Sequence, residues 1–533
     1  MRRTRIEAGQ MDDMKSIGVD KEKSPNRSSA AMISLLGGYV ILVITVVQGL
    51  VLMPLYLNYI GAGLYGAWLA SGGILGWLSM LDMGLASFMI QRMAVAYRRK
   101  EHSLVSAYFF TGLFLLSMLM IIFVVVAGIL SLFVPSWMGS WMGLSQQESA
   151  TLAGCFVLAA VATSLSILNS GISGLSEALQ LQLFTTVVTV IAALCGLGVT
   201  LYELLSGRGL WAIPFGLLAR IIPITLANTG YSIYLLKNDI KAPLRITREQ
   251  LRDIASNSPA LMFASVGNAI VGQSEPAMIA LLANTELVTV YVLTRRAADI
   301  VKMLLDRIGG AVYPGFSHLC GVNDKESALR TLSKILQLYS AMASLLFGSY
   351  LALNHSFVNM WVGREQYGGN TLTILIAFSL FISIRNGLVG YLYRATGEIA
   401  KGSVLITVES IVRLGLMVVL LRQFGLIGLP IAMLLSALVL KEILGRWMAR
   451  QLGTTVKSPL STMLGLSNFG YLLVLIVGMA VGIFVTASTW FYFIGLGTGY
   501  LLFSIGILLF TNPGLRETLW GLFFGPRTRP KML

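Results

Sequence analysis

The stretch VSAYFFTGLFLLSMLMIIFVVVAGIL, residues 105–130, contains no charged side chain. As a helix rising 1.5 Å per residue it would be about 39 Å long, which exceeds the ~30 Å hydrocarbon core of a bilayer. Similar runs follow one another along most of the 533 residues, of which 56% are hydrophobic and 12% are charged. Soluble domains carry about 25% charged residues. The sequence therefore predicts an all-α polytopic membrane protein.

The apolar runs and the polar segments between them predict about fourteen transmembrane helices. No segment between the runs is long enough to form a separate soluble domain. The predicted spans are 32–57, 64–90, 105–130, 149–173, 180–201, 210–236, 257–283, 287–315, 334–355, 370–393, 401–421, 426–447, 463–487 and 489–511.

The positive charges of the loops predict the orientation of these spans. If the N-terminus is cytoplasmic, the tails and loops on that side carry 28 Lys and Arg residues, and the other side carries only Arg208, Arg364 and Arg422. Such a bias marks the cytoplasmic face of membrane proteins. It predicts a multi-pass protein of the bacterial cytoplasmic (inner) membrane with both termini in the cytoplasm. It also accounts for the net charge of +15 without a nucleic-acid partner.

Matching positions in the two halves indicate an internal repeat with a nearly constant offset. The matches are Tyr65 with Tyr291, Leu81-Asp82 with Leu305-Asp306, Lys100-Glu101 with Lys325-Glu326, and Gly209-Leu210 before Pro214 with Gly425-Leu426 before Pro430. Both repeats start on the predicted cytoplasmic side, so they are parallel repeats, which place a substrate cavity between two lobes. The predicted units are a tail (1–31), an N-lobe (32–236), a basic linker (237–256), a C-lobe (257–447), a terminal helix pair (463–511) and a cytoplasmic tail (512–533).

The eighth predicted helix carries most of the charge found at membrane depth. If its six charged side chains faced lipid, the cost would be roughly 15–20 kcal/mol. The six are Arg295, Arg296, Asp299, Lys302, Asp306 and Arg307. Four of them, at positions 295, 299, 302 and 306, form one stripe on a helix. Two interpretations remain: a cationic cavity wall that holds an anionic headgroup, or a salt-bridge ladder that only fixes helix packing.

Further charged residues lie within other predicted spans and are either cavity or pairing residues. Arg220 and Arg385 have no acidic residue within one helical turn, which favours cavity positions. Glu409 and Arg413, at i and i+4, form a local pair or contact the substrate. Glu275 precedes Pro276 and could couple ion movement to a conformational change, or could be a hydrogen-bonded structural residue.

Asp82 lies near the cytoplasmic end of the second span, where an interfacial role is favoured over ion coupling. The sequence has no GxxxxGK motif for ATP binding. Its three histidines are scattered, so no metal site or cofactor is expected. The short external loops 58–63 and 284–286 leave little room for an enzyme's active site.

One segment of the first half resembles the opening of bacterial polysaccharide transporters, the oligosaccharide flippases of the multidrug/oligosaccharidyl-lipid/polysaccharide exporter superfamily. The segment comprises Pro54-Leu55-Tyr56-Leu57, Gly61, Tyr65-Gly66, Trp68 and Leu81-Asp82-Met83-Gly84-Leu85. The resemblance implies a two-lobed fold and the flipping of a polyprenyl-diphosphate-linked oligosaccharide, such as an O-antigen or other surface polysaccharide repeat unit. It implies no set of site residues.

The sequence departs from the resemblance at two points. Many such flippases have twelve helices, and the terminal pair resembles that of fourteen-helix peptidoglycan-precursor flippases. The arginines expected in the first helix of those proteins are absent, and Gln48 is the polar side chain found there instead.

Two other functions remain possible from the sequence. A cation-coupled multidrug exporter of the same superfamily would favour an acid in the first helix, which this chain lacks. A membrane component of glycan polymerisation would need a large outward loop. The expected partners of a flippase are its lipid-linked oligosaccharide, membrane lipids and the polymerase or chain-length machinery.

Overall fold

The computed structural model describes residues 27–79, 84–133, 143–243, 245–321, 325–453 and 466–524, and all regular structure in these residues is helical. The helices are α2 (Arg27–Tyr59), α3 (Ala62–Ser79), α4 (Leu85–Arg98), α5 (His102–Phe133), α7 (Gln146–Ala178), α8 (Leu183–Leu205), α9 (Ala212–Leu235), α10 (Arg248–Leu282), α11 (Thr285–Gly321), α12 (Lys325–Trp361), α13 (Asn370–Ala395), α14 (Ile399–Phe424), α15 (Gly428–Leu452), α17 (Leu466–Phe484), α18 (Trp490–Thr511) and α19 (Pro513–Phe524).

Each of the fourteen predicted spans falls on a described helix, and the second falls on both α3 and α4. Nine segments of the described residues are long and apolar enough to cross a membrane by composition alone, and one of these contains both α14 and α15. The prediction of an all-α polytopic membrane protein is confirmed. Two details differ: α10 begins at Arg248, nine residues before the predicted start, and α19 extends the helical part beyond the fourteenth span.

The same helix pairings occur in both halves of the chain. Contacts of α2 with α8, α5 with α7, α7 with α9 and α8 with α9 recur as α10 with α14, α12 with α13, α13 with α15 and α14 with α15. The repeated Gly-Leu motif forms a 3-10 turn at Gly209–Trp211 before α9 and at Gly425–Ile427 before α15. Both turns start at a glycine with positive φ, 55° and 60°, a backbone conformation that glycine adopts without strain.

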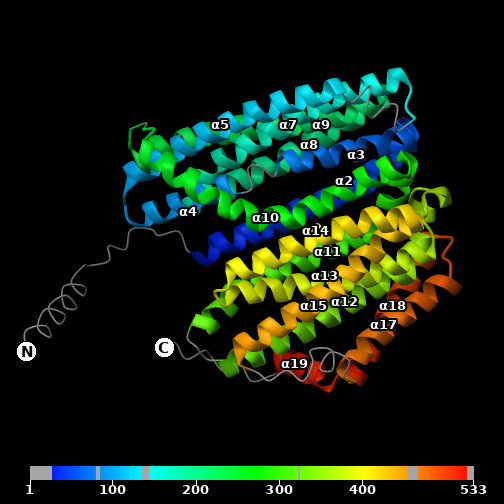
Figure 1. Ribbon diagram of the computed structural model, residues 1–533. Helices are drawn as coiled ribbons and strands as arrows, with labels where there is room; N and C mark the ends of the chain where they lie inside the picture. Colours follow the sequence, from blue (N-terminus) through cyan, green and yellow to red (C-terminus); the bar gives the residue numbers. More distant parts are fainter. Residues whose placement is uncertain are drawn as a thin grey trace, which may run out of the picture.

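We call α2–α9 the first bundle and α10–α15 the second bundle. Figure 1 shows the two bundles as separate groups of helices, with α2 and α10 where the groups meet. The helix α3 packs against both α10 and α11. The contact is close, because the Thr289 hydroxyl donates to the Ala62 carbonyl over 2.8 Å and the Trp361 indole donates to the Leu50 carbonyl over 2.7 Å.

The terminal helices α17 and α18 pack on α12 of the second bundle. Small residues allow this approach: a Cβ atom added to Gly478 would lie 2.4 Å from the carbonyl oxygen of Gly348. Close helix packing through small residues is typical of membrane proteins. The Tyr500 hydroxyl also donates to the Val474 carbonyl over 2.8 Å, which joins the two terminal helices.

The charged helix α11 is one continuous helix of 37 residues. Its length of about 55 Å exceeds the hydrocarbon thickness of a bilayer. The Asn284 side chain caps it by accepting from the Leu287 backbone N–H over 2.7 Å. Because α11 contacts α3, α12 and α13, its charged side chains have protein neighbours on several sides.

Candidate functional site

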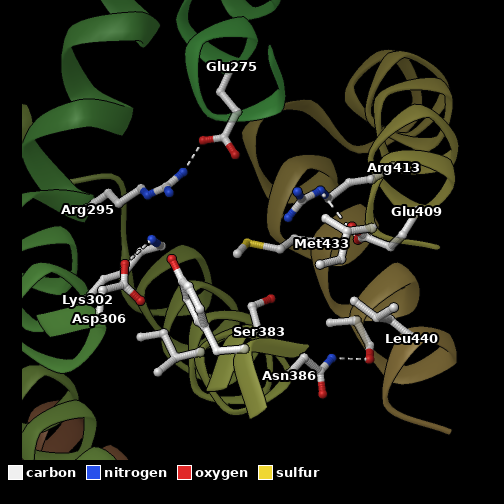
Figure 2. Close-up of a pocket in the computed structure, with 15 residues that line it drawn as sticks. Glu275, Arg295, Lys302, Asp306, Ser383, Asn386, Glu409, Arg413, Met433 and Leu440 are labelled. Atoms are coloured by element: carbon white, nitrogen blue, oxygen red, sulfur yellow. Dashed lines mark hydrogen bonds and ion pairs between the residues drawn. The ribbon is translucent and has the colours of Figure 1, made fainter. Parts of the chain in front are cut away.

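A cavity of about 340 Å³ lies inside the second bundle, among helices α10, α11, α13, α14 and α15. Figure 2 shows charged side chains of α11 and α14 approaching it from opposite sides. Its lining residues are Glu275, Arg295, Lys302, Asp306, Ser383, Ile384, Asn386, Gly387, Tyr391, Ile406, Glu409, Arg413, Met433, Ala437 and Leu440.

Three ion pairs line this cavity. Glu275 of α10 pairs with Arg295 of α11, and Nζ of Lys302 lies 2.6 Å from Oδ2 of Asp306. On α14, Nε of Arg413 lies 3.5 Å from Oε1 of Glu409. The lining thus contains three acids and three bases. Its charge is balanced rather than cationic.

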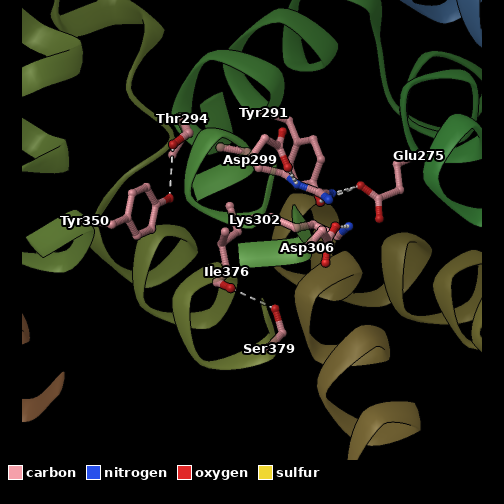
Figure 3. A network of polar contacts seen from close by, with 10 residues as sticks. Glu275, Tyr291, Thr294, Asp299, Lys302, Asp306, Tyr350, Ile376 and Ser379 are labelled. Atoms are coloured by element: carbon pink, nitrogen blue, oxygen red, sulfur yellow. Dashed lines mark hydrogen bonds and ion pairs between the residues drawn. The ribbon is translucent and has the colours of Figure 1, made fainter. Parts of the chain in front are cut away.

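Arg295 is the centre of a buried polar network, and Figure 3 labels its partners Glu275, Tyr291 and Asp299. Its Nε donates to Oδ1 of Asp299 over 2.9 Å, and its Nη1 donates both to Glu275 and to the Tyr291 hydroxyl. That hydroxyl donates in turn to Oε2 of Glu275 over 3.1 Å. The Glu275 side chain is 5% exposed and that of Arg295 is 13% exposed. Two carboxylates and a hydroxyl therefore hold one guanidinium away from solvent, as a buried charge requires.

A second set of hydrogen bonds fixes the turn of α11 next to Arg295. The Tyr350 hydroxyl and the Asn354 amide of α12 both donate to the Thr294 carbonyl over 3.0 Å. The Thr294 hydroxyl accepts from the Gly368 backbone N–H over 2.8 Å. These contacts fix the rotation of α11 and so determine which way each of its charged residues points.

Arg296 and Arg307 lie beside α2 of the first bundle. A Cβ atom added to Gly49 would lie 2.2 Å from Nη2 of Arg296, and one added to Gly38 would lie 3.6 Å from Nη1 of Arg307. The two glycines are eleven positions apart, and so are the two arginines. The later glycine contacts the earlier arginine, so α2 and α11 are antiparallel here. We call these two arginines and two glycines the arginine seam.

The arginine seam carries positive charge that no described carboxylate balances. Neither Arg296 nor Arg307 has an ion-pair partner among the described residues, whereas Arg295 has two and Lys302 and Arg413 each have one. Nε of Arg296 is buried and has no hydrogen-bond acceptor in the described part of the chain. Eleven residues correspond to about 16 Å along a helix. The seam therefore places its two guanidinium groups at different positions along the axis of α11.

The remaining predicted residues lie elsewhere. Arg385 of α13 lies over the Phe381 ring at 5.6 Å, and its Nε is buried without a hydrogen bond within the described residues. Arg220 of α9 packs against Gly196 of α8. Asp82 lies outside the described residues. In the part of the chain that the structure describes, no group of three or more His, Cys, Asp or Glu side chains could hold a metal ion.

Sequence reasoning missed the Tyr291 hydroxyl and the glycines of α2. The sequence identifies Tyr291 only as a repeat match, although this residue lies one turn before Arg295 and therefore on the same face of the helix. Gly38 and Gly49 have the same spacing of eleven as Arg296 and Arg307. That coincidence was visible in the sequence, but only a packed structure shows that the two spacings face each other.

A family model described as "Polysaccharide biosynthesis protein" matches residues 34–320, which is more than half of the chain. The chain belongs to this polysaccharide biosynthesis family. The match covers the whole first bundle apart from the first turns of α2, and it includes α10 and almost all of α11 with the arginine seam. No curated protein matches the chain.

Solved structures share the fold of this polysaccharide biosynthesis family member at low sequence identity. The lipid II flippase MurJ in an inward closed conformation is 12% identical, with a TM-score of 0.64 over 90% of this chain and 98% of that one. An inward-facing MATE family multidrug resistance transporter of the MOP superfamily is 14% identical, with a TM-score of 0.57 over 77% of this chain and 96% of that one. An outward-facing MATE family transporter of the same superfamily is 13% identical, with a TM-score of 0.53 over 79% of this chain and 95% of that one.

Proposed function

We propose that this chain is a flippase that moves a polyprenyl-diphosphate-linked oligosaccharide, a repeat unit of a surface polysaccharide, across the cytoplasmic membrane. The observation that carries the proposal is the arginine seam. A diphosphate is strongly disfavoured in a hydrocarbon environment unless cations accompany it. Guanidinium groups suit that role because they remain charged and donate bidentate hydrogen bonds to phosphate oxygens.

The position of the seam supports transport rather than static binding. Arg296 and Arg307 lie between the two bundles, where one bundle can move relative to the other, and they lie about 16 Å apart along α11. A diphosphate could pass from one guanidinium to the next as the bundles rock, as in alternating access. Arg220 and Arg385, which have no described ion-pair partner, are further candidates for contact with the substrate.

The charge-balanced cavity of the second bundle suits ion coupling better than anion binding. Each acid of this cavity pairs with an Arg or Lys side chain in the present conformation. These acids are Glu275, Asp306 and Glu409, with Asp299 beside them. Binding of a proton or sodium ion to one of these acids would release its basic partner. We propose that such an exchange biases the position of α11, and that Asp82 of the first half is a further candidate for this role.

The distribution of basic residues supports a cytoplasmic location for both termini. The helix pairings that recur in the two halves support an N-lobe and a C-lobe with the predicted boundaries. A flippase with this orientation would present its substrate to a polymerase on the outer side of the membrane. The polymerase or chain-length machinery is therefore a proposed partner.

The test neutralises the seam in the double variant Arg296→Gln/Arg307→Gln. Charge-assisted hydrogen bonds contribute about 1.5–3 kcal/mol each, so losing them should reduce export by about tenfold or more. In a deletion strain complemented with the variant, lipid-linked oligosaccharide should accumulate on the cytoplasmic leaflet and surface glycan should fall. The amount of variant in the membrane should equal that of the wild type, because the seam arginines have no described partner to lose.

The matched control is Arg330→Gln, which removes an exposed arginine of α12 that pairs with Glu326. It should export normally. Normal export by the double variant would contradict the proposal. Unchanged surface glycan in the deletion strain, together with new drug sensitivity, would instead favour the multidrug exporter.

A further inference from the structure

A second cavity, of about 240 Å³, lies in the first bundle among α2, α7, α8 and α9, and it is open to the surface at Glu177, whose side chain is exposed. It is far more polar than an ordinary interior of a membrane helix bundle. Its lining residues are Ile41, Asn169, Ser173, Ser176, Glu177, Gln182, Thr185, Thr186, Thr189 and Asn228. Only one of the ten side chains is apolar, and none of them is basic.

The two cavities lie among corresponding helices of the two halves of the chain. The helices α2, α7, α8 and α9 correspond in the repeat to α10, α13, α14 and α15, which line the charged cavity together with α11. The repeat has therefore produced two cavities of different chemistry. One carries three ion pairs, and the other carries amides, hydroxyls and a single carboxylate.

The hydrogen bonds of the hydroxyl groups show what the polar cavity can bind. The hydroxyls of Ser176, Thr185 and Thr189 donate to the carbonyls of Ser173, Gln182 and Thr185 over 2.7 to 2.8 Å. Because each hydroxyl has one donor, these groups have only acceptor capacity left for a ligand.

Asn228 leaves a further acceptor without a partner. Its Nδ2 donates to Oδ1 of Asn169 over 3.0 Å, whereas its own Oδ1 is buried and has no hydrogen bond within the described residues. Asn228 is 2% exposed, and a buried polar atom without a partner is costly. With the Glu177 carboxylate, which also only accepts when ionised, these groups favour a ligand that supplies donors, and the amide groups of Asn169 and Gln182 can donate to the same ligand.

We propose that this cavity binds a sugar residue of the lipid-linked oligosaccharide while the arginine seam holds the diphosphate. Each sugar hydroxyl supplies a donor for these acceptors, and the ring is uncharged. A diphosphate is disfavoured because it consists of acceptors and its charge would be repelled by the Glu177 carboxylate. The volume is below the roughly 300 Å³ at which pockets for drug-sized ligands begin, which suits one sugar residue rather than the whole chain. This inference rests on the proposed flippase function.

The experiment measures binding of two probes to the full-length protein in lipid nanodiscs. The first probe is lipid-linked oligosaccharide extracted from a deletion strain that accumulates it, and the second is polyprenyl diphosphate without sugar. The variants are Glu177→Gln and Thr189→Val, which keep side-chain shape and remove acceptors. Each lost hydrogen bond contributes about 0.5–1.5 kcal/mol, so their combination should weaken binding of the glycosylated probe about tenfold and leave the sugar-free probe unaffected.

Two controls separate this inference from the proposed function. Arg296→Gln should weaken the binding of both probes, because both carry the diphosphate. Thr225→Val should change the binding of neither probe. It removes a hydroxyl of α9 that donates to the Ile221 carbonyl and does not line the cavity. Failure of the wild type to bind either probe would overturn the flippase function itself.

Other outcomes overturn the sugar site alone. Equal binding of both probes by the wild type and the double variant would show that the cavity does not contact sugar. A shift in the sodium dependence of transport in the double variant, with unchanged affinity for the glycosylated probe, would assign the acceptors to a cation instead.

Discussion

Arg295 and Arg296 are neighbours in the chain and have opposite surroundings. A rotation of about 100° per residue along a helix turns the first towards Glu275 and Asp299 inside the second bundle. It turns the second towards Gly49 of the first bundle. The same residue type therefore serves two purposes: one arginine is a partner in a fixed network, and the other keeps its donors free for a ligand.

This difference predicts how the network around Arg295 responds to the loss of its acids. The double variant Glu275→Gln/Asp299→Asn leaves a buried guanidinium without a carboxylate, which costs about 3–5 kcal/mol of stability. Thermal unfolding in detergent should therefore begin at a clearly lower temperature. Adding Arg295→Met should restore most of the loss, because the unpaired charge is then gone.

The matched control for that variant is Asp306→Asn. Asp306 also pairs on α11, but its side chain is 44% exposed, and exposed pairs contribute about 0–1 kcal/mol. If the double variant unfolds no earlier than this control, Arg295 does not depend on its two acids.

Helices were predictable from the sequence because hydropathy and loop charge are local properties. The continuous helix α11 was expected in spite of its charges, and the repeated Gly-Leu motif does form the same turn twice. The ion pairs between helices were not predictable. The partner of Arg295 on α10 is 20 residues away, and the expected stripe supplied only Asp299. The cavity inside the second bundle was not predictable either, because it depends on the rotation of α11, which is set by contacts such as that of Tyr350 with Thr294. The substrate cavity expected between the two lobes stays a prediction.

The contact of α3 with α11 predicts a specific effect of helix packing. A Cβ atom added to Gly66 would lie 1.8 Å from the Thr285 carbonyl oxygen, and a backbone atom cannot move aside as a side chain can. Gly66→Ala should therefore force the two helices apart. In a background with the native cysteines replaced by serine, the pair Ala62→Cys/Thr289→Cys should form a disulfide readily, and Gly66→Ala should reduce its formation.

Gly63 gives the control for the Gly66→Ala substitution. A Cβ atom there would lie 3.8 Å from the nearest atom, in the Glu286 side chain, which is an ordinary contact. Gly63→Ala should leave disulfide formation unchanged. Equal crosslinking in Gly66→Ala would show that α3 and α11 are not in tight contact in the membrane.

At the scale of the whole molecule, the two halves share their helix arrangement and differ in the chemistry of their cavities. Both halves use the same helix pairings. The first has a cavity of amides and hydroxyls, and the second has a cavity of ion pairs. The arginine seam lies between the halves rather than in either cavity. A substrate with a charged diphosphate and neutral sugars could therefore contact both halves through different groups.

Transport from the cytoplasmic to the outer side requires that the basic loops face the cytoplasm. Labelling of single cysteines can test that orientation. Arg99 and Lys325 lie at one predicted end of the helices, whereas Arg208 and Arg364 lie at the other, and all four are exposed. In a background without native cysteines, a membrane-impermeant maleimide should label Arg208→Cys and Arg364→Cys on intact cells. It should label Arg99→Cys and Lys325→Cys only after lysis, because positive loops are retained in the cytoplasm. Labelling of Lys325→Cys on intact cells would place the basic loop before α12 outside. The second bundle would then be inverted relative to the first, and α11 could not cross the membrane as the seam requires.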